Sequence, residues 1–355
     1  MDSQFHKDSK GYWEAPFPFR KNRKRLANTH KQALYRAKQF SSCLMKDKTK
    51  RQHVIEFMDQ LIQKHHAEVA PPISSDEECW YLPLFGVYHP KKPYKIRLVF
   101  DSSSKCEGQS LNDVLLSGPD LTNSLLGVIM RFRREEVAIM ADVEQMFYCF
   151  RVIPDHQNFL RFLWHEDNDV NKPLIEYRMT VHVFGNSPSP AIATYGMRRT
   201  VKEVEHIYGT DVTHYIERDF YVDDGLTSQQ SVEDAVDLMK RTHKALSLGK
   251  LRLHKIASNN SEVMKSFDTE DLSSDLKNLD FAVDSLPTQR SLGLNWNLES
   301  DSFFFKISKD SKSYTRRDVL STIPVFLTPW FFFSPSDSPG KVNHEKSASR
   351  NFQLG

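Results

Sequence analysis

The spacing of apolar residues divides the chain into a helical N-terminal part and a body of alternating strands and helices. In residues 46–66, apolar side chains recur every three or four positions, which predicts a helix with one buried stripe. Val54, Met58 and Leu61 lie on this stripe. Pro71-Pro72 then interrupts the pattern and marks a boundary. We therefore expect one or two packed helices before this boundary.

From residue 80 onward, short runs of β-branched and aromatic residues alternate with helical patterns. These runs predict strands at residues 80–89, 95–101, 137–142, 158–165, 174–181 and 214–222. Helical spacing predicts helices at residues 122–133, 191–207 and 231–246. The last helix opens with Ser231 and has Asp234 three residues later, a capping-box pattern. Two further runs, 290–296 and 302–307, flank a polar turn and predict a hairpin. The body is therefore expected to mix strands and helices.

Beyond residue 323 the apolar residues show neither the three- to four-residue period of a helix nor the two-residue period of a strand. Residues 324–335 are rich in proline and aromatic side chains, and residues 336–355 are polar, so we expect a disordered tail. The whole chain of 355 residues is 39% hydrophobic and 26% charged, which is typical of a globular protein.

The composition also bears on where the protein is found. No apolar stretch is long enough to span a membrane and the first ten residues are polar, so we expect an intracellular protein of the cytoplasm or nucleus, without a membrane anchor or signal peptide. The four cysteines are far apart and form no C-x-x-C pair, which predicts reduced thiols rather than disulfides or a zinc site.

Charge is unevenly distributed along the chain. Residues 1–70 contain 15 lysines and arginines against 7 acidic residues, a net charge of +8, whereas the remainder contains 33 against 39, a net charge of −6. The run Arg20-Lys21-Asn22-Arg23-Lys24-Arg25 suits the phosphate backbone of nucleic acid, and a solvated tail is the alternative.

Two adjacent carboxylates follow a strand-like run of large residues in Phe220-Tyr221-Val222-Asp223-Asp224-Gly225. Neighbouring acids repel each other unless a cation neutralises them, and Mg²⁺ binds through carboxylates together with substrate phosphates. An ordinary solvated turn is the alternative reading of these two residues. Asp142 closes the buried strand predicted at residues 137–142 and could bring a third carboxylate to the same sheet edge; a simple turn cap is its alternative role.

At this point the sequence resembles the reverse transcriptases of retroelements, and in particular those of the Pao/BEL group of long-terminal-repeat retrotransposons. The ordered motifs are Asp142 with Phe147, then Phe184-Gly185-Asn186-Ser187 with Ser189-Pro190-Ala191, then Tyr221-Val222-Asp223-Asp224. Supporting stretches are Arg97–Ser103, Leu253–Asn259 and Leu292–Trp296. The match extends from about residue 11 to residue 323.

The resemblance implies an α+β right-hand polymerase fold, with fingers and a palm whose antiparallel sheet packs against helices. It implies a fingers and palm body with a primer-grip hairpin at residues 80–308, while charge and helical spacing predict a basic helical segment at residues 1–72. The start of a truncated thumb would follow at residues 309–323, and the tail at residues 324–355 departs from the family.

The resemblance also implies the reaction, which is RNA-directed DNA synthesis by two-metal phosphoryl transfer onto a primer 3′-hydroxyl. Asp142, Asp223 and Asp224 would hold two Mg²⁺ ions, or Mn²⁺ in their place, with help from the Val143 carbonyl. Lys255 matches the lysine proposed to protonate the leaving pyrophosphate, and an ordinary surface charge is its alternative. The implied partners are an RNA template, a DNA primer and deoxynucleoside triphosphates, with no membrane; the oligomeric state is left open.

Nucleotide-binding roles follow from the same resemblance. Arg97, with Lys95 beside it, matches the arginine that neutralises the triphosphate, and an exposed strand arginine is the alternative. Phe147 matches the aromatic gate against ribonucleotides, and a core aromatic is its alternative. Gly185 falls where the backbone approaches template and nucleotide, and Tyr221 precedes the two carboxylates within the same motif.

Two other functions compete with this reading. A catalytically inert retroelement remnant could fold and still bind nucleic acid or a protein partner, as the loss of most of the thumb would allow. Another two-metal phosphoryl-transfer enzyme, such as a nuclease, is a further alternative, although the order of the motifs speaks against it.

Overall fold

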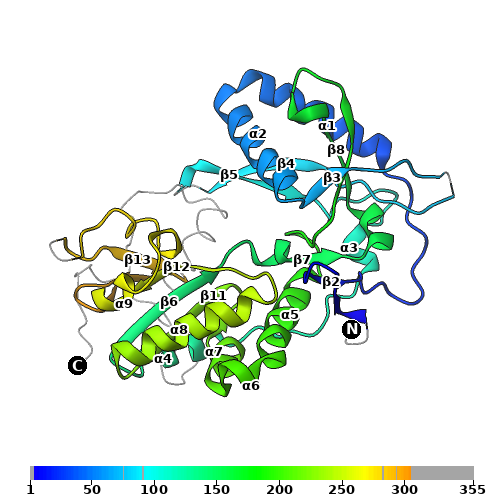
Figure 1. Cartoon of the computed structure of the whole chain (residues 1–355). Coiled ribbons are helices and arrows are strands. Elements are labelled where there is room, and N and C mark those ends of the chain that lie inside the picture. Colours follow the sequence, from blue (N-terminus) through cyan, green and yellow to red (C-terminus); the bar gives the residue numbers. More distant parts are fainter. Residues whose placement is uncertain (1–3, 75, 90–91, 282–283, 293, 305–355) are drawn as a thin grey trace, which may run out of the picture. The chain divides into compact units, whose positions relative to one another are not determined.

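The computed structural model describes residues 4–74, 76–89, 92–281, 284–292 and 294–304 (Figure 1). The chain divides into two compact units, each built from three separate stretches of sequence. Unit 1 comprises Met1–Thr122, Val143–Glu217 and Lys240–Arg252, and unit 2 comprises Asn123–Asp142, Arg218–Met239 and Leu253–Gly355. The predicted thumb start at residues 309–323 and the tail at residues 324–355 lie outside the described residues, and the predicted boundary between residues 72 and 80 stays a prediction.

Unit 1 combines helices with three small sheets. Its α-helices are α1 (His30–Lys46), α2 (Lys48–Gln63), α3 (Leu111–Val114), α5 (Ser189–Glu203), α6 (Glu205–Tyr208) and α7 (Thr210–Arg218), the last of which ends at the unit border. Its 3₁₀ helices are η2 (Met146–Cys149), η3 (Pro154–Leu160) and η4 (Glu166–Asn168). One sheet has the order β1 (His6–Lys7), β2 (Trp13–Ala15), β7 (Phe150–Val152), and another has the order β3 (Ala67–Val69), β9 (Leu174–Met179), β8 (Arg161–His165). β4 (Leu84–His89) and β5 (Lys92–Phe100) form an antiparallel hairpin.

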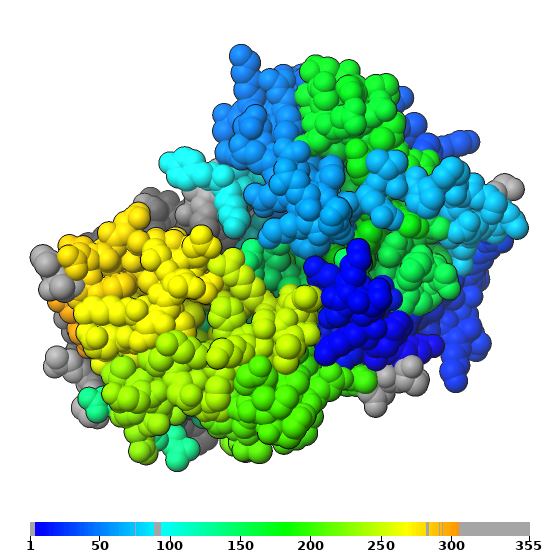
Figure 2. Space-filling model, in the orientation of Figure 1, coloured from blue at the N-terminus to red at the C-terminus, as the bar shows by residue number. Residues whose placement is uncertain are grey.

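The helical N-terminal part is confirmed as two helices. Asp47 separates them, because its extended backbone ends α1 while its side chain accepts a hydrogen bond from the Lys50 amide at 2.9 Å and caps α2. The predicted stripe of Val54, Met58 and Leu61 is buried. Both helices pack on the strands of unit 1, and Figure 2 shows their outer surface exposed.

Unit 2 is built on a four-stranded sheet with the order β10 (Phe220–Tyr221), β11 (Asp224–Gln229), β6 (Val137–Val143), β12 (Leu253–Ser258). The helix α4 (Leu125–Phe132) packs against β10 and β11. The remaining elements are α9 (Ser261–Lys265), the 3₁₀ helix η5 (Thr269–Asp271) and a sheet of β13 (Thr288–Ser291), β14 (Leu294–Asn297) and β15 (Ser302–Phe304). The helix α8 (Val232–Ser247) continues from unit 2 into unit 1.

Packed apolar side chains support both units. In unit 1, rings such as Phe100 and Phe162 meet edge to face with centroids 5.2 Å apart, in a core that extends from α2 to β9. In unit 2, Trp296 on β14 packs on Phe132 of α4 with centroids 4.9 Å apart. The Trp296 ring nitrogen donates to Asp301 at 2.8 Å, so its burial leaves no polar atom unsatisfied.

The strand predicted at residues 214–222 is wrong over most of its length. Residues 210–218 form α7, and only Phe220 and Tyr221 are in a strand. Val212, Tyr215 and Ile216 are buried and recur at helical spacing, so the apolar period of this segment is that of a helix. The β-branched and aromatic residues within residues 214–222 suggested a strand and concealed this helical period.

Other predicted elements differ only in their limits. The strand predicted at residues 158–165 begins at Arg161, because Pro154 opens η3 before it. The helix predicted at residues 191–207 is broken at Val204 into α5 and α6. Of the hairpin predicted at residues 290–307, β14 and β15 pair as expected, while the first run is divided between β13 and β14 and residues 305–307 lie outside the described part.

The cap predicted for α8 is confirmed. The Ser231 hydroxyl accepts a hydrogen bond from the Asp234 amide at 3.1 Å and donates one to the Asp234 carboxylate at 2.8 Å. The described cysteines are free thiols, and no described helix is long and apolar enough to cross a membrane.

Candidate active site

The sheet of unit 2 brings Asp142 and Asp224 together as direct cross-strand partners. β6 is buried from Val137 to Ala141 and presents Asp142 near its end. β11 runs antiparallel to it, in a register that places Asp224 opposite Asp142. The Cβ atoms of such partners lie about 4.5–5.5 Å apart, within reach of one cation. The sequence therefore predicted correctly that these two acids meet at one sheet edge.

Asp223 lies in the turn between β10 and β11. Tyr221 pairs with Asp224, so Val222 and Asp223 form a two-residue hairpin loop. Val222 has a φ of 60°, a left-handed conformation that is strained for a β-branched residue and that tight hairpin turns require at their first position. The surrounding sheet holds this strain, and strained backbone of this kind is concentrated at functional sites.

Both oxygens of Asp142 are engaged by consecutive residues of β12. His254 Nε2 lies 2.8 Å from Oδ1, and Lys255 Nζ donates to Oδ2 at 2.7 Å. Burial opposes ionisation of Asp142, yet the hydrogen bonds from His254 and Lys255 outweigh it and lower the pKa of this carboxyl. Asp142 is therefore a carboxylate at neutral pH.

A backbone irregularity explains how two consecutive residues reach the same carboxylate. Side chains alternate between the two faces of a regular strand. Lys255, however, has a φ of 52°, so the alternation of β12 is interrupted there as it is at a β-bulge. His254 is the contact of the candidate site that sequence reasoning missed, because a half-buried histidine in a strand shows no spacing that marks it.

The electrostatic surroundings of Asp224 have the opposite effect from those of Asp142, because they raise the pKa of its carboxyl. Burial raises the pKa of Asp224 to about 7, and the charges of Asp223 and Asp142 add to the shift, while Lys255 opposes it. Three acids thus compete for charge at one sheet edge, which is the condition that a bound cation relieves.

The donor chemistry fits a hard divalent cation, since all three side chains offer carboxylate oxygens. The three carboxylates are less closely gathered here than the ligands of a bound metal ion. Among the described residues, no group of three or more His, Cys, Asp or Glu side chains is gathered closely enough to hold a metal ion. The two oxygens of Asp142 contact His254 and Lys255 instead.

The remaining predicted nucleotide-binding residues belong to unit 1, except Tyr221, which is half-buried on β10. Lys95 and Arg97 lie on β5 with exposed side chains. Val143 is buried at the last position of β6. The roles of these residues toward the three carboxylates stay predictions.

Phe147 is a buried ring under an exposed one. It belongs to η2 and is 8% exposed, and its centroid lies 4.4 Å from that of Phe184, which is 47% exposed. Phe184 therefore shields Phe147 from solvent in unit 1.

The loop after Phe184 is held by Asn112, which lies in α3 between the capping-box residues Ser110 and Asp113. The Asn112 side chain donates to the Gly185 carbonyl at 2.8 Å and accepts from the Ser187 amide at 2.9 Å. Gly185 has a φ of 106°, and a Cβ there would lie 3.1 Å from the Phe100 carbonyl oxygen. The conformation and the space both demand glycine at this position.

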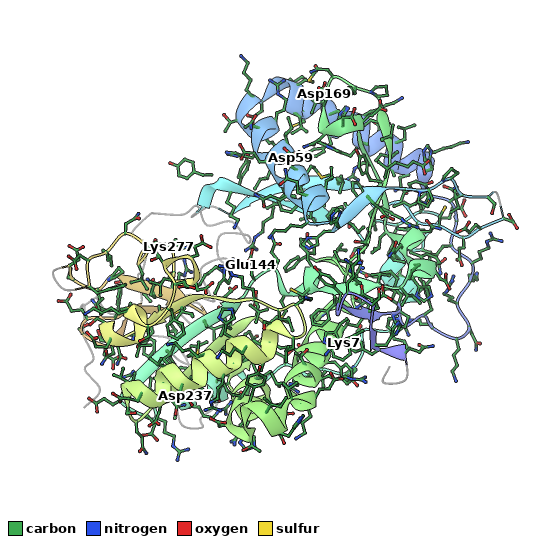
Figure 3. All side chains as sticks on the ribbon, in the orientation of Figure 1. Lys7, Asp59, Glu144, Asp169, Asp237 and Lys277 are labelled. Atoms are coloured by element: carbon green, nitrogen blue, oxygen red, sulfur yellow. The ribbon has the colours of Figure 1, made fainter. Side chains whose placement is uncertain are left out.

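Glu144, labelled in Figure 3, follows β6 in unit 1 and contacts Arg252, which precedes β12. Its carboxylate pairs with Lys64 at 3.2 Å and with Arg252 at 3.4 Å. Its amide also donates to the Arg252 carbonyl at 2.9 Å.

Comparisons with known proteins bear on the fold. No protein-family model and no curated protein matches the chain. Among solved structures, a foamy viral protease-reverse transcriptase in complex with dsDNA aligns with a TM-score of 0.53 and 14% identity, over 91% of this chain and 53% of that one. The foamy viral protease-reverse transcriptase dRH in complex with dsDNA aligns with a TM-score of 0.50 and 15% identity, over 88% of this chain and 42% of that one.

These similarities establish a mixed α/β, reverse transcriptase-like fold. The chain spans about half the length of the two foamy viral chains, so their activities do not transfer to it as a whole.

Proposed function

We propose that the chain is a reverse transcriptase domain of the Pao/BEL type, an RNA-directed DNA polymerase that adds deoxynucleotides to a primer 3′-hydroxyl. The observation that carries this proposal is the register of β6 and β11, which pairs Asp142 with Asp224 and places Asp223 in the adjoining turn, within a reverse transcriptase-like fold. In this proposal residues 80–308 supply fingers and palm, and residues 1–72 form a basic helical segment.

Asp142, Asp223 and Asp224 are the residues that would hold Mg²⁺, with the Val143 carbonyl as a further oxygen donor. When bound, the metal would lower the pKa of the primer hydroxyl and neutralise the pyrophosphate leaving group. The chain's own contribution at Asp142 is to keep this carboxylate ionised and oriented, which the contacts of His254 and Lys255 support.

The other roles concern the nucleotide. Lys255 is proposed to give a proton to the leaving pyrophosphate, for which its exposed ammonium at the sheet edge is suited. Arg97 and Lys95 are proposed to neutralise the triphosphate, and Phe147 to exclude a ribose 2′-hydroxyl. Because Phe184 covers Phe147, the two rings would act on the sugar as one packed unit.

The proposed partners are an RNA template and a DNA primer. The foamy viral proteins with this fold are seen in complex with double-stranded DNA, which supports template–primer binding here.

A second candidate function is an inert domain that binds nucleic acid without catalysis. It is favoured by the looseness of the carboxylate arrangement, in which no three side chains of the described residues are gathered around a metal position.

Primer extension separates the two functions. The full chain is given an RNA template, a DNA primer, deoxynucleotides and Mg²⁺, beside an Asp142→Asn variant and the matched surface control Asp275→Asn. The proposed enzyme extends the primer, loses this activity in Asp142→Asn and keeps it in Asp275→Asn. Template binding without extension by the wild-type chain would favour the inert domain.

A further inference from the structure

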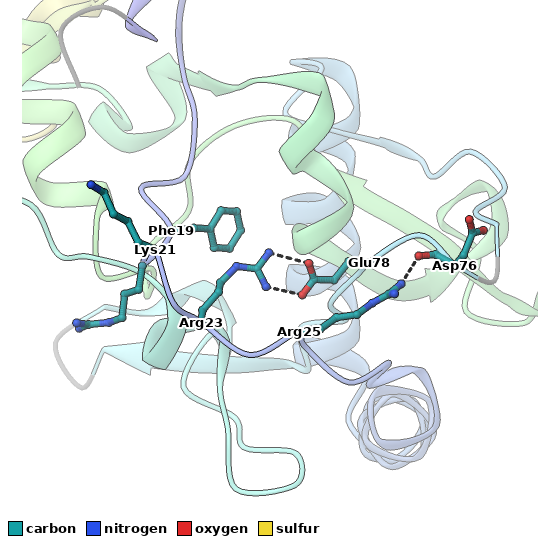
Figure 4. Close-up of a pocket in the computed structure, with 7 residues that line it drawn as sticks. Phe19, Lys21, Arg23, Arg25, Asp76 and Glu78 are labelled. Atoms are coloured by element: carbon teal, nitrogen blue, oxygen red, sulfur yellow. Dashed lines mark hydrogen bonds and ion pairs between the residues drawn. The ribbon is translucent and has the colours of Figure 1, made fainter.

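The basic segment, defined as Arg20, Lys21, Arg23, Lys24 and Arg25, is built into unit 1. Four of these residues, Arg20, Lys21, Arg23 and Arg25, line an open hollow together with Phe19, Asp76 and Glu78 (Figure 4). A solvated tail has no fixed contacts, so the contacts of this segment decide between the two readings of its charge.

Arg23 anchors the segment to Glu78. Its guanidinium forms a two-point ion pair with the Glu78 carboxylate, with N to O distances of 2.5 and 2.7 Å. The same carboxylate accepts a hydrogen bond from the Leu26 amide at 2.6 Å, and the Leu26 side chain is buried. Burial opposes ionisation of Glu78, but these bonds outweigh it and lower its pKa, so the anchor is charged at neutral pH.

Further contacts fix both ends of the segment. The Arg20 amide donates to the Val114 carbonyl at 2.9 Å, and Arg25 donates to the Asp76 carbonyl. The Arg23 guanidinium also lies 4.2 Å from the centroid of the Phe19 ring. The segment is therefore held as part of the folded surface.

This anchoring turns three other cations toward solvent. The side chains of Arg20, Lys21 and Lys24 are exposed and make no ion pair with any residue that the structure describes. Figure 4 shows Lys21 directed away from Asp76 and Glu78. Because Arg23 already neutralises Glu78, this carboxylate does not cancel the positive charges of Arg20, Lys21 and Lys24.

We propose that Arg20, Lys21 and Lys24 form a binding surface for the phosphodiester backbone of nucleic acid. The identity of this polyanion rests on the proposed function. A backbone that is already held in place suits phosphate binding better than a mobile one, because less backbone freedom is lost on binding.

The contacts made here are to the backbone rather than to bases. The Phe19 ring is the nearest stacking platform, but Arg23 lies over it and Phe159 packs on it with centroids 4.8 Å apart. Phosphate contacts add affinity without reading sequence, so this surface adds the same affinity for every sequence.

The test uses the full chain with Arg20→Gln, Lys21→Gln and Lys24→Gln combined. A matched variant removes three exposed lysines of α1 and α2 instead, through Lys38→Gln, Lys46→Gln and Lys48→Gln. Fluorescence anisotropy measures binding to single-stranded RNA, single-stranded DNA and an RNA/DNA duplex over a range of salt concentrations. If the triple variant loses its contacts with three phosphates, the slope of log K against log salt should fall in magnitude by about two to three, at roughly 0.7 to 0.9 per contact. The matched variant should retain the wild-type slope.

An unchanged slope, or an equal change in the matched variant, overturns the proposal. Loss of binding to polyglutamate without loss of binding to nucleic acid overturns it too, because the surface then serves an acidic protein. A reduced slope in a chain that never extends a primer contradicts only the polymerase activity and leaves this surface in place.

Discussion

Two residues of β12 contact the carboxylate of Asp142, and both contacts depend on the φ angle of Lys255. The left-handed φ of Lys255 allows His254 and Lys255 to reach the same side chain. Lys255 is about half exposed, whereas His254 has only 20% of its side chain exposed. His254 is therefore the more rigid of the two contacts, and we interpret it as the residue that positions Asp142.

Replacing His254 tests this interpretation. His254→Ala removes the contact to Oδ1 and lets the carboxylate rotate, so the rate of nucleotide incorporation should fall by about 10- to 100-fold, as is usual when the support of a metal ligand is lost. The KM for the nucleotide should change little, because no nucleotide contact is removed. Steady-state primer extension measures both, with the exposed His214→Ala as the control; an unchanged rate would contradict the positioning role.

Among the elements, the small sheet of β13, β14 and β15 depends on one tryptophan. Trp296 is 2% exposed, packs on Phe132 and uses its ring nitrogen to bond Asp301. Arg133, at the end of helix α4, pairs with the same aspartate, so α4 contacts the hairpin through an ion pair as well as through its Phe132 ring.

Trp296→Ala should destabilise unit 2 by about 3–5 kcal/mol, the usual cost of removing a large buried ring. Asn295 on the same strand faces the other way and is only half-buried, so Asn295→Ala should cost under about 1 kcal/mol. Urea unfolding of the two variants gives the comparison, and equal losses would show that Trp296 does not anchor the sheet.

The elements also show what the sequence could predict. The buried apolar run of β6 predicted both the strand and the end at which Asp142 lies. β11 gave no such signal, because Thr227 and Ser228 are polar yet buried, with the Ser228 hydroxyl bonded to the Glu135 amide. His254 was not predictable, since its contact with Asp142 depends on the left-handed φ of Lys255, which no residue type in β12 encodes.

For the molecule as a whole, two histidines of unit 1 make stability depend on pH, His182, which is buried, and His66, which is half-buried. Burial lowers the pKa of His182 to about 4, and burial together with the charges of Lys64 and Arg151 lowers that of His66 to about 4. Their unfolded pKa is about 6.5, so between pH 6.5 and 4 the unfolded chain binds protons that the folded chain does not. Both contributions to stability are complete above pH 6.5 and are lost as the pH falls toward 4.

His182→Gln should remove its share of this dependence. Between pH 7 and pH 4.5 the wild-type protein should lose on the order of 2–3 kcal/mol through His182 alone, and the variant should lose that much less. Denaturant unfolding at several pH values measures the difference, with the exposed His214→Gln as the control. Parallel pH profiles for wild type and His182→Gln would contradict this account.

Mn²⁺ binding by the full chain tests whether Asp142, Asp223 and Asp224 act together as one divalent-cation site. Because this measurement needs no template or complete polymerase, it tests the carboxylates themselves. We expect that the wild-type chain binds Mn²⁺, that Asp142→Asn and Asp223→Asn each weaken binding by about 10-fold or more, and that Asp275→Asn does not. Binding that is equally strong in all four proteins, or absent from the wild-type chain, would contradict this expectation.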